Sequence, residues 1–271
     1  MPERRPRLAG KVAIVTGAGS SGEGIGNGKA AAVLFAREGA KVLAVDLVPD
    51  RAEETVAMIR EDGGEASVFQ ADVTNAGDCD RMAEAAVERY GRLDILDNNV
   101  GIGRRGTVLD TSEEDWNRVM AVNLKSMVLA SKAAIPKMIE GGGGSIINIS
   151  SIAGLRAHSS APYTASKAGV IGLTIAMAAD HAKDNIRVNS IAPGMVYTPI
   201  VVPRVDEATR ERRKNAAPLA TEGTGWDIGY AAVYLASDEA RWVTGVVLPV
   251  DAGLLAVTPF TYVPMGQHTQ Y

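Results

Sequence analysis

The sequence has 271 residues, of which 46% are hydrophobic and 22% are charged, and its formal net charge is −4. This composition is typical of one globular α/β domain, and the negative charge gives no reason to expect nucleic acid or an anionic membrane as a partner. No window reaches about 18 uninterrupted apolar residues, so no membrane-spanning helix is expected.

Short β-branched runs alternate along the chain with longer segments of helical period, a pattern that predicts βα units and a parallel sheet. The expected strands are residues 12–16, 41–45, 66–71, 94–97, 145–149, 187–191 and 246–250. Asp50 with Glu53, and Ser112 with Asp115, each place a capping side chain three residues before a carboxylate and so predict two helix starts. Because no linker interrupts the alternation, we expect a single domain over residues 1–271, an α/β fold in which helices cover both faces of a doubly wound sheet of about seven strands.

A glycine-rich loop follows the first predicted strand. It contains two glycine patterns, at residues 17–22 and 24–26, and a helix-forming segment comes next. Glycine lets the backbone approach a ligand closely, and the amides at a helix N-terminus can receive a pyrophosphate. The second strand runs to Asp46, 20 residues after Gly26, where a carboxylate can bind the hydroxyls of an adenosine ribose and disfavour a 2′-phosphate. The sequence therefore predicts a Rossmann-type site for NAD rather than NADP, and both glycine patterns stay candidates for the phosphate contacts.

Tyr163 and Lys167 lie four residues apart in a predicted helix, so their side chains share one face. An ammonium close to a phenol lowers the pKa of the phenol, which suits Tyr163 to act as acid and base near neutral pH. Further polar groups follow predicted strands, among them the hydroxyls of Ser150 and Ser151. Asn123 lies in a predicted helix. Asparagine has only a moderate helix propensity, so its presence there favours a role for the hydrogen bonds of its side chain. These groups distinguish the Tyr163 and Lys167 pair from a chance pair on a surface helix.

In their order along the chain, these motifs resemble the short-chain dehydrogenase/reductase family over residues 8 to about 253. The matching segments are Thr16-Gly17 through Gly24-Ile25-Gly26, Asp72-Val73, Asn98-Asn99-Val100-Gly101, Val122-Asn123-Leu124, Ser150-Ser151, Tyr163 to Lys167, and Pro193-Gly194 with Thr198. The resemblance implies an oxidoreductase that moves a hydride between the nicotinamide of NAD and a secondary alcohol or ketone.

The same resemblance implies a catalytic tetrad of Asn123, Ser151, Tyr163 and Lys167. Ser151 would hold the substrate oxygen, and Tyr163 would exchange a proton with it. Lys167 would lower the pKa of the phenol and bind the nicotinamide ribose, and Asn123 would anchor a water. The coenzyme contacts carried over from the family are Gly17, Gly19, Ser21, Gly24, Ile25, Gly26, Asp46, Asp72, Val73, Asn99, Val100, Gly101, Tyr163, Lys167, Pro193, Gly194, Val196 and Thr198.

Three departures from the family pattern bear on these assignments. The glycine loop is about three residues longer than is usual, and Val100 stands where alanine is common. The interval from Ser151 to Tyr163 is one residue short, so spacing alone would select Ser150. Strand alternation sends the two serines to opposite faces, and we choose Ser151 because it directly precedes the turn Ile152-Ala153-Gly154.

The sequence also supports expectations about substrate and assembly. The segment 196–225 corresponds to the family's substrate-covering loop and mixes apolar residues with a basic run, residues 210–214. We interpret that run as a solvated helix face, and a fairly apolar alcohol or ketone is the expected substrate. His158 is interpreted as a polar loop residue. Helices over residues 116–139 and 161–183 carry surplus apolar side chains and predict a homotetramer.

Residues 1–7 are basic, are not followed by an apolar signal segment, and are expected to be a loose arm. The tail, residues 256–271, is expected to pack against a subunit from residue 259 onward. Cys79 is the single cysteine, which favours a cytoplasmic protein with no disulfide and no metal site. Two other functions stay open: an NADPH-dependent oxoacyl or ketone reductase, and a non-catalytic NAD sensor. The sensor is disfavoured because every position of the tetrad is filled.

Overall fold

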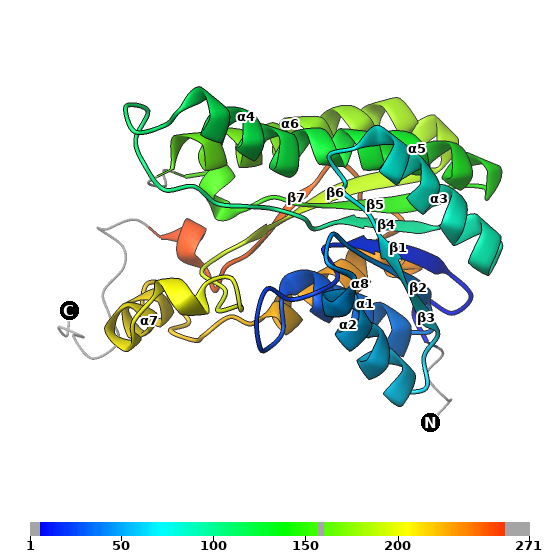
Figure 1. The fold of residues 1–271 in the computed structure, drawn as a ribbon, viewed down its shortest axis with the longest axis horizontal. Helices are drawn as coiled ribbons and strands as arrows, with labels where there is room; N and C mark the ends of the chain where they lie inside the picture. Colours follow the sequence, from blue (N-terminus) through cyan, green and yellow to red (C-terminus); the bar gives the residue numbers. More distant parts are fainter. Residues whose placement is uncertain (1–5, 157–159, 258–271) are drawn as a thin grey trace.

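Seven parallel strands form one sheet in the computed structural model, which describes residues 6–156 and 160–257 (Figure 1). The strands are β1 (Val12–Thr16), β2 (Lys41–Asp46), β3 (Ala66–Gln70), β4 (Ile95–Asn98), β5 (Gly144–Ile149), β6 (Ile186–Pro193) and β7 (Val247–Val250). Their order across the sheet is β3-β2-β1-β4-β5-β6-β7. The seven strands predicted from the sequence are thus confirmed, with bounds that differ by no more than two residues. Because the chain steps outward to β3 and returns to pair β4 with β1, the carboxyl ends of β1 and β4 border the crevice where such sheets bind ligands.

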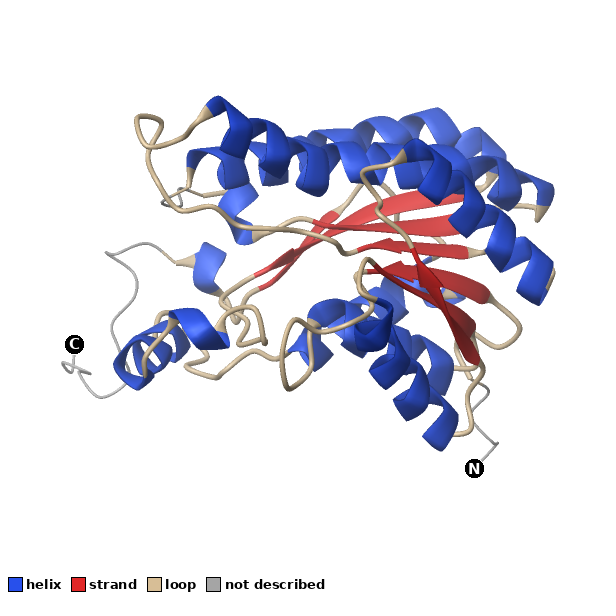
Figure 2. Cartoon of the chain, in the orientation of Figure 1, coloured by secondary structure: helices blue, strands red, loops and turns tan. Residues whose placement is uncertain are grey.

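Helices cover both faces of the sheet (Figure 2). On one face lie α1 (Asn27–Arg37), α2 (Pro49–Glu61) and α8 (Gly225–Ala236), and on the other lie α3 (Ala76–Tyr90), α4 (Glu113–Met120), α5 (Ser126–Glu140) and α6 (Ala161–His181). A π-helix, Ala121–Lys125, joins α4 to α5, and the short 3-10 helices are Ile152–Gly154, Ala182–Asp184, Val202–Arg204, Asp238–Ala240 and Leu254–Ala256. The helix α7 (Glu207–Lys214) stands apart from both layers, at the end of the sheet where the strands finish (Figure 1).

Alternation along the strands builds a hydrophobic core on each face of the sheet. On the side of α1, α2 and α8, Val15 and Ile147 pack in a cluster with Phe35, which is fully buried. On the opposite side, Ile14 and Ile146 belong to a second cluster that is covered by α3, α5 and α6. The strands are held from both sides, and their carboxyl ends form a rigid edge for a site.

The two predicted helix starts have different outcomes. Ser112 caps α4 as expected, because its hydroxyl accepts a hydrogen bond from the amide of Asp115 at 3.1 Å. The prediction at Asp50 is wrong: α2 begins at Pro49, and no side chain caps it. Proline at the first helical position has its φ already fixed and lacks the amide that a cap would satisfy. Asp50 instead lies in the first turn, where its charge favours the helix dipole.

The ends of the chain also differ from expectation where they are described. Arg7, predicted to lie in a loose arm, donates its amide to Glu38 at 2.9 Å and forms an ion pair with Glu239. Ala256, predicted to start the tail, ends a short 3-10 helix. The predicted packing of residues 259–271 and the interpretation of His158 fall outside the described residues. Within the described part, no helix is long and apolar enough to cross a bilayer.

Candidate active site

The loop after β1 adopts a conformation that requires glycine. Gly17 and Gly24 have φ angles of +64° and +110°, a region that residues with a Cβ rarely adopt. A Cβ at Gly28, the second residue of α1, would lie 2.2 Å from the carbonyl oxygen of Gly17, so the helix and the loop approach closely only with glycine there. The first turn of α1 has neither a side-chain cap nor an acidic residue. Its amides therefore remain open to an anion such as a pyrophosphate.

Asp46 ends β2 and faces the glycine loop. Its Oδ2 accepts a hydrogen bond from the Gly19 amide at 3.1 Å, and its Oδ1 accepts one from the Val48 amide at 3.0 Å. Each carboxylate oxygen can accept a further hydrogen bond from a ligand hydroxyl. The Arg51 side chain begins next to the glycine loop, because a Cβ at Gly19 would lie 2.4 Å from the Arg51 Cβ. The Arg51 guanidinium forms no ion pair with any residue in the described ranges. The sequence analysis did not single out Arg51 or Gly28. Arg51 lies in the first turn of α2, which follows β2, and Gly28 lies in the first turn of α1, which follows β1.

The end of β4 lies against the same loop. The Asn99 amide donates to Thr16 Oγ1 at 3.1 Å, and Asn99 Nδ2 donates to the Gly17 carbonyl at 3.4 Å. The Val100 side chain lies 3.2 Å from the Cβ position of Gly17, so the departure from alanine at this residue fills space beside the loop. A Cβ at Gly101 would lie 3.3 Å from Lys167 Nζ. The segment after β4 thus connects the glycine loop to the proposed catalytic lysine.

The segment after β6 reaches the glycine loop from the other side. The amide of Gly194 donates to a carbonyl of β7 at 2.9 Å, which extends the pairing of these strands by one residue. Further along, Pro199 lies 3.5 Å from the Cβ position of Gly24. Val196 and Thr198 are buried between these two contacts. The structure therefore brings together the segments after β1, β4 and β6, including Pro193, the last residue of β6.

The other residues assigned to the coenzyme from the sequence are Ser21, Ile25, Gly26, Asp72 and Val73. Ser21 is exposed on the glycine loop, and Gly26 is the residue directly before α1. After β3, Val73 is buried, while Asp72 Oδ1 accepts hydrogen bonds from the amide and the hydroxyl of Thr74 at 2.9 and 2.7 Å. That oxygen stabilises the turn before α3, a contact that the sequence-based assignment did not anticipate.

Tyr163 and Lys167 lie on one face of α6, and Ser151 meets them from the end of β5. The hydroxyls of Ser151 and Tyr163 are hydrogen-bonded. Lys167 Nζ lies 5.8 Å from the centre of the Tyr163 ring and donates to the Ile149 carbonyl at 2.7 Å. A hydroxyl, a phenol and an ammonium therefore converge at the carboxyl ends of β4 and β5.

The two serines at the end of β5 have separate roles in the fold. Ser150 Oγ donates to the Lys167 carbonyl at 2.8 Å, which ties the strand to the backbone of α6. Ser151 Oγ accepts from the Ala153 amide at 3.1 Å and also reaches Tyr163. The structure thus brings Ser151 rather than Ser150 to the phenol, although the residue spacing alone favoured Ser150.

Asn123 lies within the π-helix, where it is fully buried. Its Nδ2 donates to the Ile102 carbonyl and to Ser166 Oγ, both at 3.0 Å, and its Oδ1 accepts from the Ile102 amide at 2.8 Å. Ser166 is the neighbour of Lys167 on α6. The Asn123 amide therefore fixes the segment after β4 against α6, and π-bulges of this kind often occur at functional sites.

Burial dominates the electrostatics of the phenol and the ammonium. It lowers the pKa of Lys167 to about 8, because the charged form loses its hydration. It raises the pKa of Tyr163 above its ordinary value, and the hydrogen bond from Ser151 opposes this shift. In the protein alone the pKa of Tyr163 is thus raised, and not lowered as expected from Lys167, because desolvation outweighs the hydrogen bond to Ser151.

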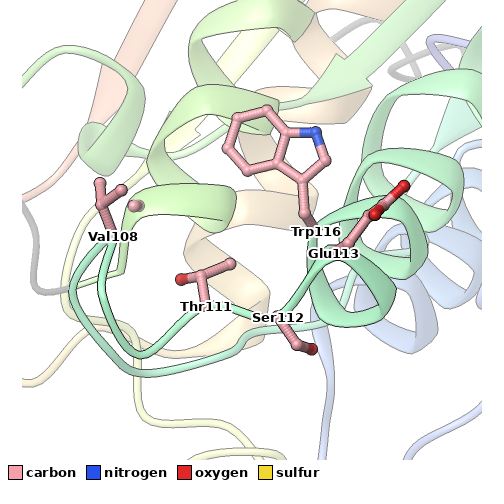
Figure 3. Close-up of a pocket in the computed structure, with 6 residues that line it drawn as sticks. Val108, Thr111, Ser112, Glu113 and Trp116 are labelled. Atoms are coloured by element: carbon pink, nitrogen blue, oxygen red, sulfur yellow. The ribbon is translucent and has the colours of Figure 1, made fainter.

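A separate apolar pocket of about 290 Å³ lies where the loop before α4 meets the first turns of α4 and α6. Figure 3 shows Val108, Thr111 and Trp116 around it, and Ala161 is the part of α6 that lines it. No residue of the tetrad borders this pocket. Within the described ranges, no cluster of His, Cys, Asp or Glu has the arrangement of a metal site.

Comparisons with known proteins agree with this architecture. The family described as enoyl-(acyl carrier protein) reductase matches residues 19–255. The chain is 39% identical over 250 residues to 3-oxoacyl-(acyl-carrier-protein) reductase FabG of Thermotoga maritima, a match that covers 92% of this chain and 99% of that protein. It is 42% identical over 248 residues to 2,5-dichloro-2,5-cyclohexadiene-1,4-diol dehydrogenase LinX of Sphingobium indicum, over 91% of this chain and 97% of that protein.

Among solved structures, 7α-hydroxysteroid dehydrogenase in complex with NADH and 7-oxo glycochenodeoxycholic acid has a TM-score of 0.86 and 35% identity to this chain. The match covers 92% of this chain and 96% of that chain. The chain belongs to the short-chain dehydrogenase/reductase family, as its motifs indicated. It is an oxidoreductase of that family, whose members use a nicotinamide coenzyme.

Proposed function

We propose that the protein is an NAD(H)-dependent oxidoreductase that interconverts a secondary alcohol and a ketone, with Tyr163 as the general acid and base. The observation that carries the proposal is the hydrogen bond between the Ser151 and Tyr163 hydroxyls, one helical turn from Lys167. A phenol with a second hydroxyl beside it can hold and protonate one oxygen atom. The experiment that tests the proposal follows nicotinamide absorbance over a panel of alcohols and ketones with each coenzyme.

In this proposal the nicotinamide accepts or donates the hydride when it is bound. The uncapped amides of α1 would hold its pyrophosphate, and the carboxylate of Asp46 would hold its adenosine ribose. Ser151 would orient the substrate oxygen, and Tyr163 would remove the hydroxyl proton during oxidation or return it during reduction. Lys167 would bind the nicotinamide ribose, and its ammonium would favour the phenolate of Tyr163 once the charged coenzyme is bound. Asn123 would keep the segment after β4 in place beside Lys167.

Preference for NAD over NADP is expected to depend on Asp46. A 2′-phosphate would face this carboxylate, and like charges about 4 Å apart at an effective dielectric of about 20 repel by about 4 kcal/mol. Even half of that repulsion exceeds a tenfold preference. We expect the parent enzyme to favour NAD at least tenfold in kcat/KM, and Asp46→Asn, which keeps a hydrogen-bond acceptor for Gly19, to lose most of that preference.

The matched control for this prediction is Asp50→Asn, which removes an exposed carboxylate from the first turn of α2 without touching the glycine loop. Its coenzyme preference should equal that of the parent. Equal use of both coenzymes by the parent, or a preference that survives in Asp46→Asn, would show that Asp46 does not select the coenzyme.

NADPH-dependent reduction of an oxoacyl group or ketone is the second candidate function. It is favoured by the likeness to FabG, which is an oxoacyl reductase by name. It is also favoured by Arg51 beside the glycine loop, whose guanidinium has no ion-pair partner among residues 6–156 and 160–257. The coenzyme comparison above separates the two candidates, since this one requires a preference for NADPH. A non-catalytic sensor is disfavoured because all four positions of the tetrad hold competent side chains.

Action in the cytoplasm and assembly as a homotetramer are parts of the same proposal. The helices predicted to pair expose large apolar side chains at Trp116, Val128, Ile139 and Ile175. Burial of these side chains against a second copy would remove apolar surface from water. Light scattering should therefore give a mass near four times the 28.4 kDa chain. Charge on this surface, as in Ile175→Lys, should lower that mass.

The matched control for the assembly prediction is Leu219→Lys, since Leu219 is also exposed but lies between α7 and α8 and belongs to neither of these helices. This variant should keep the mass of the parent. A parent mass close to that of one chain at working concentration would contradict the prediction.

A further inference from the structure

Three arginines from two different segments flank the open end of the site. Arg105 lies in the loop between β4 and α4, and Arg204 and Arg213 lie in the segment between β6 and α8. The two segments face each other, because a Cβ at Gly103 would lie 3.7 Å from Arg204 Nη1. Figure 1 shows this loop and α7 at the same end of the sheet, beyond the carboxyl ends of the strands.

The segment that carries Arg105 is attached to the catalytic helix. It starts at Gly101, whose Cβ position lies 3.3 Å from Lys167 Nζ. It then passes the start of α6, where the Ser160 hydroxyl donates to the carbonyl of Arg104. Ser160 is three residues before Tyr163. The loop that carries Arg105 is therefore fixed to the start of the helix that carries Tyr163.

Arg213 borders the site from the opposite side. Its Nη2 donates to the carbonyl of Val196 at 3.3 Å, in the segment after β6 that reaches the glycine loop. Its side chain is partly buried, whereas the neighbouring Arg212 is exposed and bonds the hydroxyl of Thr209 on its own helix. The interpretation of the basic run as a solvated helix face is thus wrong for Arg213.

Among the described residues these three guanidinium groups have no carboxylate partner, whereas most of the cations around them have one. The paired neighbours are Arg104 with Asp115 at 2.9 Å, Arg210 with Glu222 at 2.7 Å and Lys214 with Glu211 at 3.7 Å. In the part of the chain that the structure describes, neither Arg105, Arg204 nor Arg213 has a carboxylate within ion-pair distance. Carboxylates therefore neutralise Arg104, Arg210 and Lys214, whereas these three arginines stay available to a ligand.

The positive charges also act on one another. Burial lowers the pKa of Arg213, the charge on Arg105 lowers it further, and Glu222 opposes both effects. Glu222 itself is bound to Arg210 by two hydrogen bonds of 2.7 Å, so it does not act as a dedicated partner for Arg213. Arg105 and Arg213 repel each other, and an anion between them would relieve this repulsion.

We propose that Arg105, Arg204 and Arg213 bind an anionic group, such as a carboxylate, on the substrate whose hydroxyl or carbonyl Tyr163 acts upon. Guanidinium groups bind carboxylates through paired, charge-assisted hydrogen bonds. This inference rests on the proposed function, because it names the class of alcohol or ketone that the site would take. It adds a charged end to the apolar substrate expected from the sequence, whose carbon chain would lie against the apolar residues of the segment after β6.

The test compares hydroxy acids with their methyl esters, which differ in charge but share the reacting alcohol. The probes are 3-hydroxybutanoate, 4-hydroxypentanoate and 5-hydroxyhexanoate, so that the distance between the alcohol and the carboxylate varies. We expect at least one acid to exceed its ester by about tenfold or more in kcat/KM, because charge-assisted hydrogen bonds contribute at about this level. Added salt should reduce the advantage of the acid and leave the ester unchanged.

Three variants locate the effect. Arg105→Gln, in an exposed loop, and Arg213→Gln should each remove most of the preference for the acid through a higher KM, with the ester and the coenzyme unaffected. The control is Arg212→Gln, which removes one positive charge from the same helix and should keep the preference. A changed KM for the coenzyme in place of the substrate would mean that the arginines bind a coenzyme phosphate, and would overturn the proposal.

A binding measurement separates this inference from the proposed function. Calorimetry with the parent and reduced coenzyme should show hexanoate binding about tenfold more tightly than hexanamide, and Arg105→Gln should abolish the difference. If no alcohol or ketone reacts but this difference is found, the proposed function fails and the anion site stands. If esters and acids react equally well, or hexanoate binds no better than hexanamide, the anion site is refuted and the proposed function stands or falls on turnover alone.

Discussion

Replacing Tyr163 with Phe is expected to lower kcat by about 10²- to 10⁴-fold or more in both directions, which is the usual contribution of a positioned acid and base. The change removes the proton that the proposed mechanism exchanges with the substrate oxygen, and it keeps the ring that packs beside Lys167. Coenzyme affinity, measured by the change in NADH fluorescence, should stay close to that of the parent. A variant that kept most of its turnover would exclude Tyr163 as the acid and base.

The matched control is Tyr230→Phe, which removes a phenol hydroxyl from an exposed side chain of α8, on the other face of the sheet. Its turnover should equal that of the parent. The pH dependence gives a second check, because oxidation requires the phenolate and reduction requires the phenol. Since burial raises the pKa of Tyr163, oxidation should still increase with pH well above neutrality, whereas reduction should decrease only as the pH approaches that raised pKa.

The strands could be predicted from the sequence because their signal is local. In a parallel sheet covered on both faces, each strand is a short, almost continuous apolar run, and β1 is buried at all five of its residues. Helix starts were less secure, since several side chains near α2 could serve as a cap and only the fold shows that Pro49 begins the helix. Arg7 was misread for a similar reason: its partners Glu38 and Glu239 are distant in the sequence.

The candidate site shows the same limit at closer range. Motif order was enough to find Tyr163 and Lys167, which share one helix. The choice between Ser150 and Ser151 depends on the direction of two side chains at a strand end, and the structure shows one bonded to the α6 backbone and the other to the phenol. The expected direction of the pKa shift of Tyr163 was wrong, because the burial of the phenol cannot be deduced from the spacing of a phenol and an ammonium in the sequence.

Asp97 illustrates a feature that the sequence contains but does not explain. It lies in β4 between Val15 of β1 and Ile147 of β5, two buried apolar neighbours. It is 1% exposed, and neither carboxylate oxygen has a hydrogen-bond partner among the described residues. Burial raises the pKa of its carboxyl to about 8. A buried polar group without partners destabilises a fold, by about 1 to 3 kcal/mol in mutational data.

Asp97→Val is therefore expected to raise the free energy of unfolding by about 2 kcal/mol or more at pH 7, because it replaces an unpartnered carboxyl with an apolar side chain. Urea denaturation followed by circular dichroism measures this. Asp94 provides the contrast, since it is also buried but accepts hydrogen bonds from the Val12 amide and from Arg92. Asp94→Asn should destabilise the protein, because it breaks these contacts in place. A loss of stability in both variants would mean that Asp97 has a partner after all.

The pH dependence of the effect follows from the direction of the shift. The folded protein keeps the proton on Asp97 up to about pH 8, whereas the unfolded chain loses it near about pH 4. Between these values the folded state binds more protons, so the contribution of Asp97 to stability is fully present below about pH 4 and is lost as the pH rises through about 8. The slope is about 1.4 kcal/mol per pH unit, or about 6 kcal/mol over the range from about pH 4 to about pH 8. The difference in unfolding free energy between the parent and Asp97→Asn cancels the other titrating groups, and it should fall along this slope from pH 5 to 8 and level off above that range. Parallel stability curves for the two proteins would show that Asp97 is ionised in the fold.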